Sequence, residues 1–145
     1  MVLAGVVIVA PAARAQDSDI AAARDLYASA AYDDALALLN RLHASDRPPA
    51  EAKIIEQYRA FCLLALGRAA DADKAIEAVV TAEPSYHPSD SDVSPRIRNA
   101  FADVRRRMLP VIVQQKYAQA KAAYERKEWA AAASGFSQVL VTIAD

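Results

Sequence analysis

Residues 51–84 read EAKIIEQYRAFCLLALGRAADADKAIEAVVTAEP, and the apolar spacing within them decides the fold. Before Gly67, apolar side chains recur three and four residues apart, as they do on one face of a helix. They are Ile54, Tyr58, Phe61 and Ala65. After Gly67 the same spacing returns at Ala72, Ala75, Ile76, Val79 and Val80. Because Gly tolerates the left-handed conformation that ends many helices, and Pro84 cannot continue one, the stretch predicts a helical hairpin.

The residues before this hairpin predict a second one. The acidic segment at 17–19 offers N-cap oxygens to a helix that begins near Ile20. Another helix follows at about Asp33, with its apolar side chains directed inward. These are Ala35, Leu39 and Leu42.

The residues after the hairpin predict a long helix and a final short one. Ser94 and Pro95 form a helix start, with Ser as the N-cap and Pro in the first turn. One apolar stripe runs through Ile97, Phe101, Val104 and Met108, and another, in shifted phase, through Val113, Tyr117, Ala120 and Tyr124. The change of phase predicts a kink or a break near Pro110. A last helix from about Glu128 places on one face Trp129, Ala132, Ala133, Phe136, Val139, Leu140 and Ile143.

Composition limits the classes of protein to consider. The chain has 145 residues, of which 54% are apolar and only 3 are Gly, so we expect one ordered domain. A formal charge of −1 provides no overall field to attract nucleic acid. The single Cys excludes an internal disulfide and a Cys-based zinc site.

The amino terminus resembles a secretory signal peptide. An apolar run at 2–10 is followed by small residues at Ala13 and Ala15, which is a typical cleavage pattern. No Lys or Arg precedes the run, and the alternative is a short hydrophobic helix packed on the domain. We interpret residues 1–15 as a signal peptide and 16–145 as the mature domain, which predicts an exported protein of the periplasm or cell envelope.

Aligning the hairpins on their second helices exposes an internal repeat. Tyr32, Ala69 and Trp129 are followed at the same offsets by a small residue and then by a bulky one. The small residues are Ala35, Ala72 and Ala132, and the bulky ones are Leu39, Ile76 and Phe136. Small residues let the two helices of one hairpin approach closely, while large ones fill the gap to the next hairpin.

This pattern resembles the tetratricopeptide repeat (TPR), a helical hairpin of about 34 residues. The best match is the middle unit, where Ala60, Gly67, Ala72 and Pro84 stand at family positions. Asp19, Glu56 and Lys116 replace the Trp of the family's first helix. The resemblance implies an all-α fold, a right-handed α-solenoid of about three hairpins, with units near 16–49, 53–86 and 113–145. Residues 87–112 are then an inserted loop and helix, and we expect one long, kinked helix over 95–126, which keeps helix directions alternating.

No catalytic constellation is found in the sequence. There is no phosphate loop, nucleophile elbow or metal-spaced His pair, so we expect no enzyme activity, no cofactor and no metal. His87 with Asp90 and Asp92 reads as a solvated turn and not as a metal site. Cys62, on an apolar helix face, is expected to be a buried inert thiol.

Two groups of residues are candidates for binding. A basic patch comprises Arg96, Arg98, Arg105, Arg106 and Arg107. These charges are scattered around their helix, which favours a solvated surface over an anion site. The resemblance implies that first helices line a concave groove. On this chain that groove would contain Arg24, Tyr27, Gln57, Phe61, Leu64, Tyr117, Lys121 and Tyr124, although the aromatic members could instead belong to the core.

We therefore expect a non-catalytic protein–protein interaction module that binds a peptide or protein through its concave face. The alternative is a structural or spacer segment of a larger envelope protein, for example a TonB-like energy transducer, truncated at residue 145. Nucleic acid is not expected as a partner, and the sequence predicts no oligomeric state.

Overall fold

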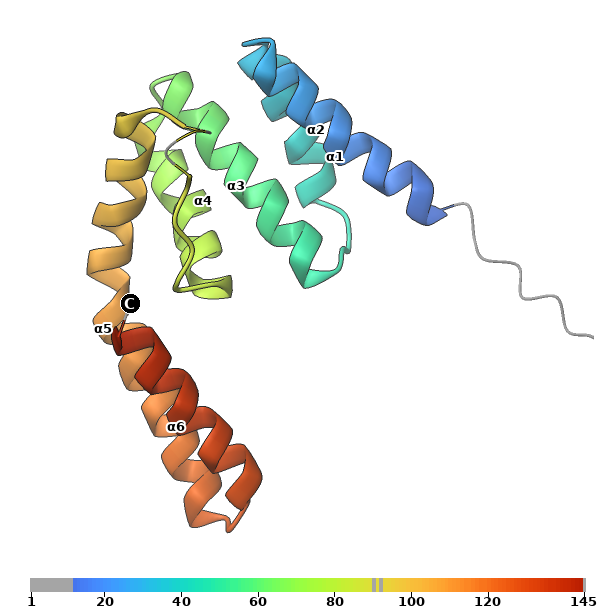
Figure 1. Ribbon diagram of the computed structural model, residues 1–145. Coiled ribbons are helices and arrows are strands. Elements are labelled where there is room, and N and C mark those ends of the chain that lie inside the picture. The colour runs from blue at the N-terminus through green and yellow to red at the C-terminus, as the bar shows by residue number, and fades with distance from the viewer. Residues whose placement is uncertain (1–11, 90, 92, 145) are drawn as a thin grey trace, which may run out of the picture.

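The computed structural model describes residues 12–89, 91 and 93–144, and within these it is all-helical, with no strand. The all-α prediction is therefore confirmed. The helices are α1 (Ala12–Ala28), α2 (Tyr32–His43), α3 (Pro49–Ala65), α4 (Ala69–Ala82), α5 (Pro95–Glu125) and α6 (Trp129–Ala144). Successive helices pack against each other from α1 to α6, and α1 also contacts α3 (Figure 1).

Three of the inter-helix turns have the same backbone. Each contains one residue with positive φ: Ala30 (60°), Gly67 (76°) and Lys127 (63°). In each turn, the backbone N–H of this residue and the backbone N–H of the residue after it donate hydrogen bonds to carbonyl groups of the preceding helix. The second of these bonds joins Ala31 to Leu26 at 2.9 Å, Arg68 to Leu63 at 2.8 Å and Glu128 to Ala123 at 3.0 Å. This is the Schellman pattern, and it makes α1–α2, α3–α4 and α5–α6 equivalent hairpins.

The predicted repeat alignment matches these hairpins. Tyr32, Ala69 and Trp129 are each the first residue of a second helix. The small residues that follow are buried in all three, with Ala35 and Ala72 fully inaccessible. At this position the methyl group of Ala fits between the two helices of a hairpin, whereas a larger side chain would push them apart.

The main hydrophobic core lies among α1 to α4 and the first half of α5. Its most deeply buried large side chains include Leu39, Ile55, Ile76, Val79 and Val104. The few buried apolar side chains of the α5–α6 hairpin lie outside this cluster. They are Ala120, Ala123, Ala132 and Val139.

Helix α5 is continuous through Pro110, at the middle of its 31 residues. The expectation of one long helix is thus confirmed. Figure 1 shows its axis turning partway along, as expected from a residue that lacks an N–H and crowds the preceding turn. At 1.5 Å per residue the helix is about 46 Å long. Its first half packs against α4, and its second half carries α6 away from the other helices.

A glycine sets the spacing within the α5–α6 hairpin. A Cβ at Gly135 would lie 2.8 Å from the Cβ of Ala120 and 3.2 Å from its Cα. The two helices therefore meet almost backbone to backbone, and their interface is thin. Because α6 has no comparable contact with another described helix, this interface fixes its position.

The start of α1 differs from the expectation. The helix begins at Ala12, and residues 17–19 lie inside it instead of capping it near Ile20. Ala and Gln are strong helix formers, so the helix extends upstream. The predicted signal peptide falls mainly on residues 1–11, which lie outside the described residues.

Candidate functional site

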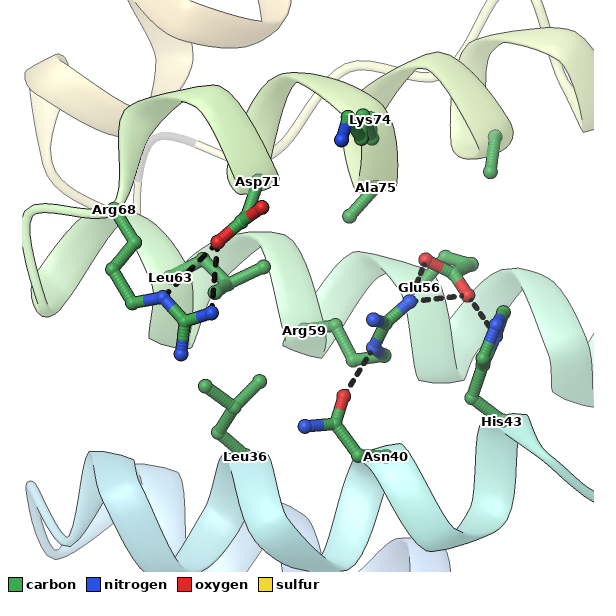
Figure 2. Close-up of a pocket in the computed structure, with 11 residues that line it drawn as sticks. Leu36, Asn40, His43, Glu56, Arg59, Leu63, Arg68, Asp71, Lys74 and Ala75 are labelled. Carbon is green, nitrogen blue, oxygen red and sulfur yellow. Dashed lines mark hydrogen bonds and ion pairs between the residues drawn. The ribbon is translucent and has the colours of Figure 1, made fainter.

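A polar pocket of about 360 Å³ opens between α2, α3 and α4 (Figure 2). Its floor is apolar, formed by residues such as Leu36, Leu63 and Ala75. Its polar lining consists of Asn40, His43, Glu56, Arg59, Arg68, Asp71 and Lys74. None of these seven residues was predicted from the sequence to bind a partner.

Glu56 is the centre of the pocket's hydrogen-bond network. Although charged, the residue is only 7% exposed. Arg59 Nη1 donates to both Glu56 oxygens, at 2.8 and 2.7 Å, and His43 Nδ1 contacts Oε1. Arg59 Nε also donates to Asn40 Oδ1 at 2.9 Å. These bonds satisfy the buried carboxylate and hold the Arg59 guanidinium in one orientation at the pocket wall.

A second ion pair lies at the other end of the pocket, as Figure 2 shows. Arg68 donates to Asp71 Oδ2 from Nε at 3.1 Å and from Nη2 at 2.8 Å. This hydrogen bond and the guanidinium charge lower the pKa of Asp71. Lys74, one turn along α4, has no ion pair with any described carboxylate.

The charges give the pocket a cationic excess. Arg59, Arg68 and Lys74 contribute three positive charges, and Glu56 and Asp71 contribute two negative ones, which leaves +1. The unpaired ammonium of Lys74 is the group best placed to receive an added anion.

The structure does not assemble the predicted concave set into one groove. Phe61 is 3% exposed and belongs to the core, while Leu64, which is 5% exposed, only lines the wall of a pocket beside Tyr27 and Tyr32. Phe61 contacts Tyr27, Tyr58 and Phe101 with ring centroids 5.5–5.8 Å apart. These rings fill the space that the prediction assigned to a ligand.

The remaining members of that set lie in two parts of the molecule, on α1 and α3 and on the α5–α6 hairpin. Tyr27 is half-buried, and burial together with neighbouring Tyr32 raises its pKa. Arg24 is exposed, with its guanidinium 5.4 Å from the Tyr58 ring centroid, and Gln57 is partly exposed. Tyr117, Lys121 and Tyr124 are exposed on the projecting α5–α6 hairpin.

The five arginines of α5 do not form a patch. Arg105 donates to the carbonyl of Pro84 at 2.7 Å and Arg98 to that of Val93 at 3.3 Å. Arg106 pairs with Asp103 at 3.2 Å, and Arg107 pairs with Asp73 on α4 at 3.0 Å. Arg96, near the start of α5, lines a small pocket beside Tyr27 and Tyr32. The set therefore ties α5 to its neighbours and does not converge on one anion.

The thiol of Cys62 is fully buried, and desolvation raises its pKa to about 11. It is protonated at neutral pH and enclosed by the core, which is the environment of an unreactive thiol. Among the described residues, no group of three or more His, Cys, Asp or Glu side chains is arranged to hold a metal ion. Asp90 and Asp92 lie outside the described residues.

None of the helices in the described part of the chain combines the length and apolar character that crossing a membrane requires. No protein-family model matches the chain, and no match was found among curated proteins or solved structures.

Proposed function

We propose that the chain is a non-catalytic protein–protein interaction module built as a TPR-like α-solenoid. The three hairpins share one turn and one small–bulky alternation, which supports this architecture, and α1–α2 stacks on α3–α4 while the α5–α6 hairpin projects from the stack. The apolar run at 2–10 supports export to the periplasm or cell envelope.

The observation that carries the proposal is the polar pocket between α2, α3 and α4. Its walls belong to three helices of the main core, so it is preformed, and binding there costs little ordering. Its cationic excess and the unpaired Lys74 favour a carboxylate. We therefore place the partner's acidic segment in this pocket, and not in the concave groove, where Phe61 and Leu64 are buried.

Reversing the charge of Lys74 tests the proposal. The probe is an end-blocked peptide with four Glu among neutral residues, titrated calorimetrically into the full chain at low ionic strength. Lys74→Glu is expected to weaken binding by about tenfold or more, because it replaces the unpaired cation by an anion that repels the ligand.

Arg106→Glu is the matched control, since it makes the same change of net charge at an exposed site on α5. It is expected to change the affinity by less than about twofold. If wild-type chain does not bind the peptide, or if both variants lose affinity equally, the acidic-peptide site in this pocket is wrong.

The second candidate function is a structural or assembly segment of a larger envelope protein. The exposed apolar side chains of the α5–α6 hairpin favour it, because monomeric surfaces seldom gather several large ones together. Crosslinking of the full chain in envelope extracts, with mapping of crosslinks to the pocket or to this hairpin, separates the two functions.

A further inference from the structure

The α5–α6 hairpin exposes a continuous apolar surface, here called the hairpin patch. It consists of Tyr117 and Tyr124 on α5 with Trp129, Phe136, Leu140 and Ile143 on α6. Tyr117 packs on Phe136 with ring centroids 5.7 Å apart, and Tyr124 packs on Trp129 at 5.3 Å. The sequence predicted Trp129, Leu140 and Ile143 on one face of α6, together with Ala132 and Val139. Ala132 and Val139 are buried, whereas Trp129, Leu140 and Ile143 are 57%, 68% and 62% exposed, because α5 is the only described helix that packs closely on α6.

The first hairpin shows how the equivalent surface is covered. Tyr27 and Tyr32 stand in the same positions of that hairpin as Tyr124 and Trp129, five residues apart across the same turn. Their rings are 5.6 Å apart, and Tyr27 packs against Tyr58 of α3 at 5.6 Å. An aromatic pair in this position is therefore used to contact a neighbouring hairpin.

We propose that the hairpin patch is the dimer interface of this protein, and that its occupant is the hairpin patch of a second copy. α6 carries no charged residue from Trp129 to Ala144, so two copies can face each other across a twofold axis without like-charge repulsion. At the rim, Lys121 lies 3.7 Å from Glu125. This neighbouring pair offers both signs of charge to the opposite copy.

The available area is sufficient. Five of the six residues are more than half exposed, and together they offer on the order of 600 Å² in each copy, or about 1,200 Å² in a pair. This is the lower end of the range for specific interfaces, so we expect a reversible dimer at micromolar concentration.

The test is sedimentation equilibrium of the full chain over about 1–100 µM, with Leu140→Glu and Val141→Glu as a matched pair. Both residues are exposed, at 68% and 65%, but adjacent helical positions point about 100° apart, and Val141 lies outside the patch. Wild type and Val141→Glu are expected to dimerise. Leu140→Glu is expected to raise the dissociation constant about 30-fold, because it buries an unpaired charge at the interface.

A wild-type chain that stays monomeric up to 100 µM would overturn the proposal. The hairpin patch would then be a candidate binding surface for a helix of another protein. An equal effect of the two substitutions would overturn it as well. Circular dichroism of both variants confirms folding before the comparison, and Trp129→Ser provides a second disruption of the patch that introduces no charge. Peptide binding at the pocket is independent of either result.

Discussion

Phe61→Ala is expected to lower the free energy of unfolding by about 3–5 kcal/mol, the largest loss for any substitution considered. The side chain is 3% exposed and its ring contacts rings from three helices: Tyr27 of α1, Tyr58 of α3 and Phe101 of α5. Removing it opens a cavity where the first hairpin and α5 meet α3. Urea denaturation followed by circular dichroism measures the loss.

Gln57→Ala is the control for this substitution, because Gln57 lies one turn earlier on α3 and was predicted to share a binding groove with Phe61. It is only partly buried, so its replacement is expected to change stability by about 0.5 kcal/mol or less. If Phe61→Ala cost under 1 kcal/mol, the ring would not be a core residue, and the concave groove would regain its leading member.

Glu56→Ala is expected to lower the free energy of unfolding by about 2 kcal/mol. The carboxylate accepts two hydrogen bonds from Arg59 and contacts His43, while the residue is 7% exposed. Its removal leaves the partly buried guanidinium of Arg59 without its anion. Because Arg59 retains about a fifth of its side-chain exposure, water offsets some of the loss.

Two variants accompany this measurement. Asp103→Ala breaks an ion pair with Arg106 of the same i,i+3 kind, but on an exposed surface, and is expected to cost about 0.5 kcal/mol or less. Glu56→Gln keeps an acceptor oxygen and is expected to fall between the other two. Equal losses from Glu56→Ala and Asp103→Ala would mean that the buried network adds nothing to stability.

The positions of the helices and of their buried faces follow closely from helical periodicity in the sequence. Ala35, Ala72 and Ala132 recur at one repeat position, and all three are buried where paired helices meet. Gly67 identified one turn because Gly favours positive φ. Ala30 and Lys127 adopt the same positive φ although they carry a Cβ, so residue type alone did not reveal their turns. The alignment of the second helices revealed them.

The direction of the third hairpin was not predictable from the same pattern. The apolar stripe of α6 is as regular as that of α4, and periodicity indicates a buried face without saying what buries it. Pro110 marked the bend in α5, but the path of the chain beyond it depends on how the α5–α6 hairpin packs, and Gly135 sets only the spacing within that hairpin.

The candidate site was largely missed for a related reason. Its residues are polar and come from three helices, and polar residues have no periodic signature that links one helix to another. Glu56 did interrupt the apolar pattern, at the position where the TPR family has Trp. Glu56 and Arg59 are three residues apart, a spacing at which an acidic and a basic side chain can pair on one helix. This local signal could have identified the Glu56–Arg59 part of the network. The partnership with His43 and Asn40 requires the packing of α2 on α3.

The most direct test of acidic-segment binding in the α2–α3–α4 pocket is a map of the bound peptide on the chain by NMR. The same Glu-containing peptide is titrated into ¹⁵N-labelled protein, and amide shift changes are assigned to residues. We predict that the changes centre on Asn40, Arg59 and Lys74. Changes centred on Arg24, Tyr27 and Gln57, or an absence of changes at any concentration, would contradict this assignment of the binding site.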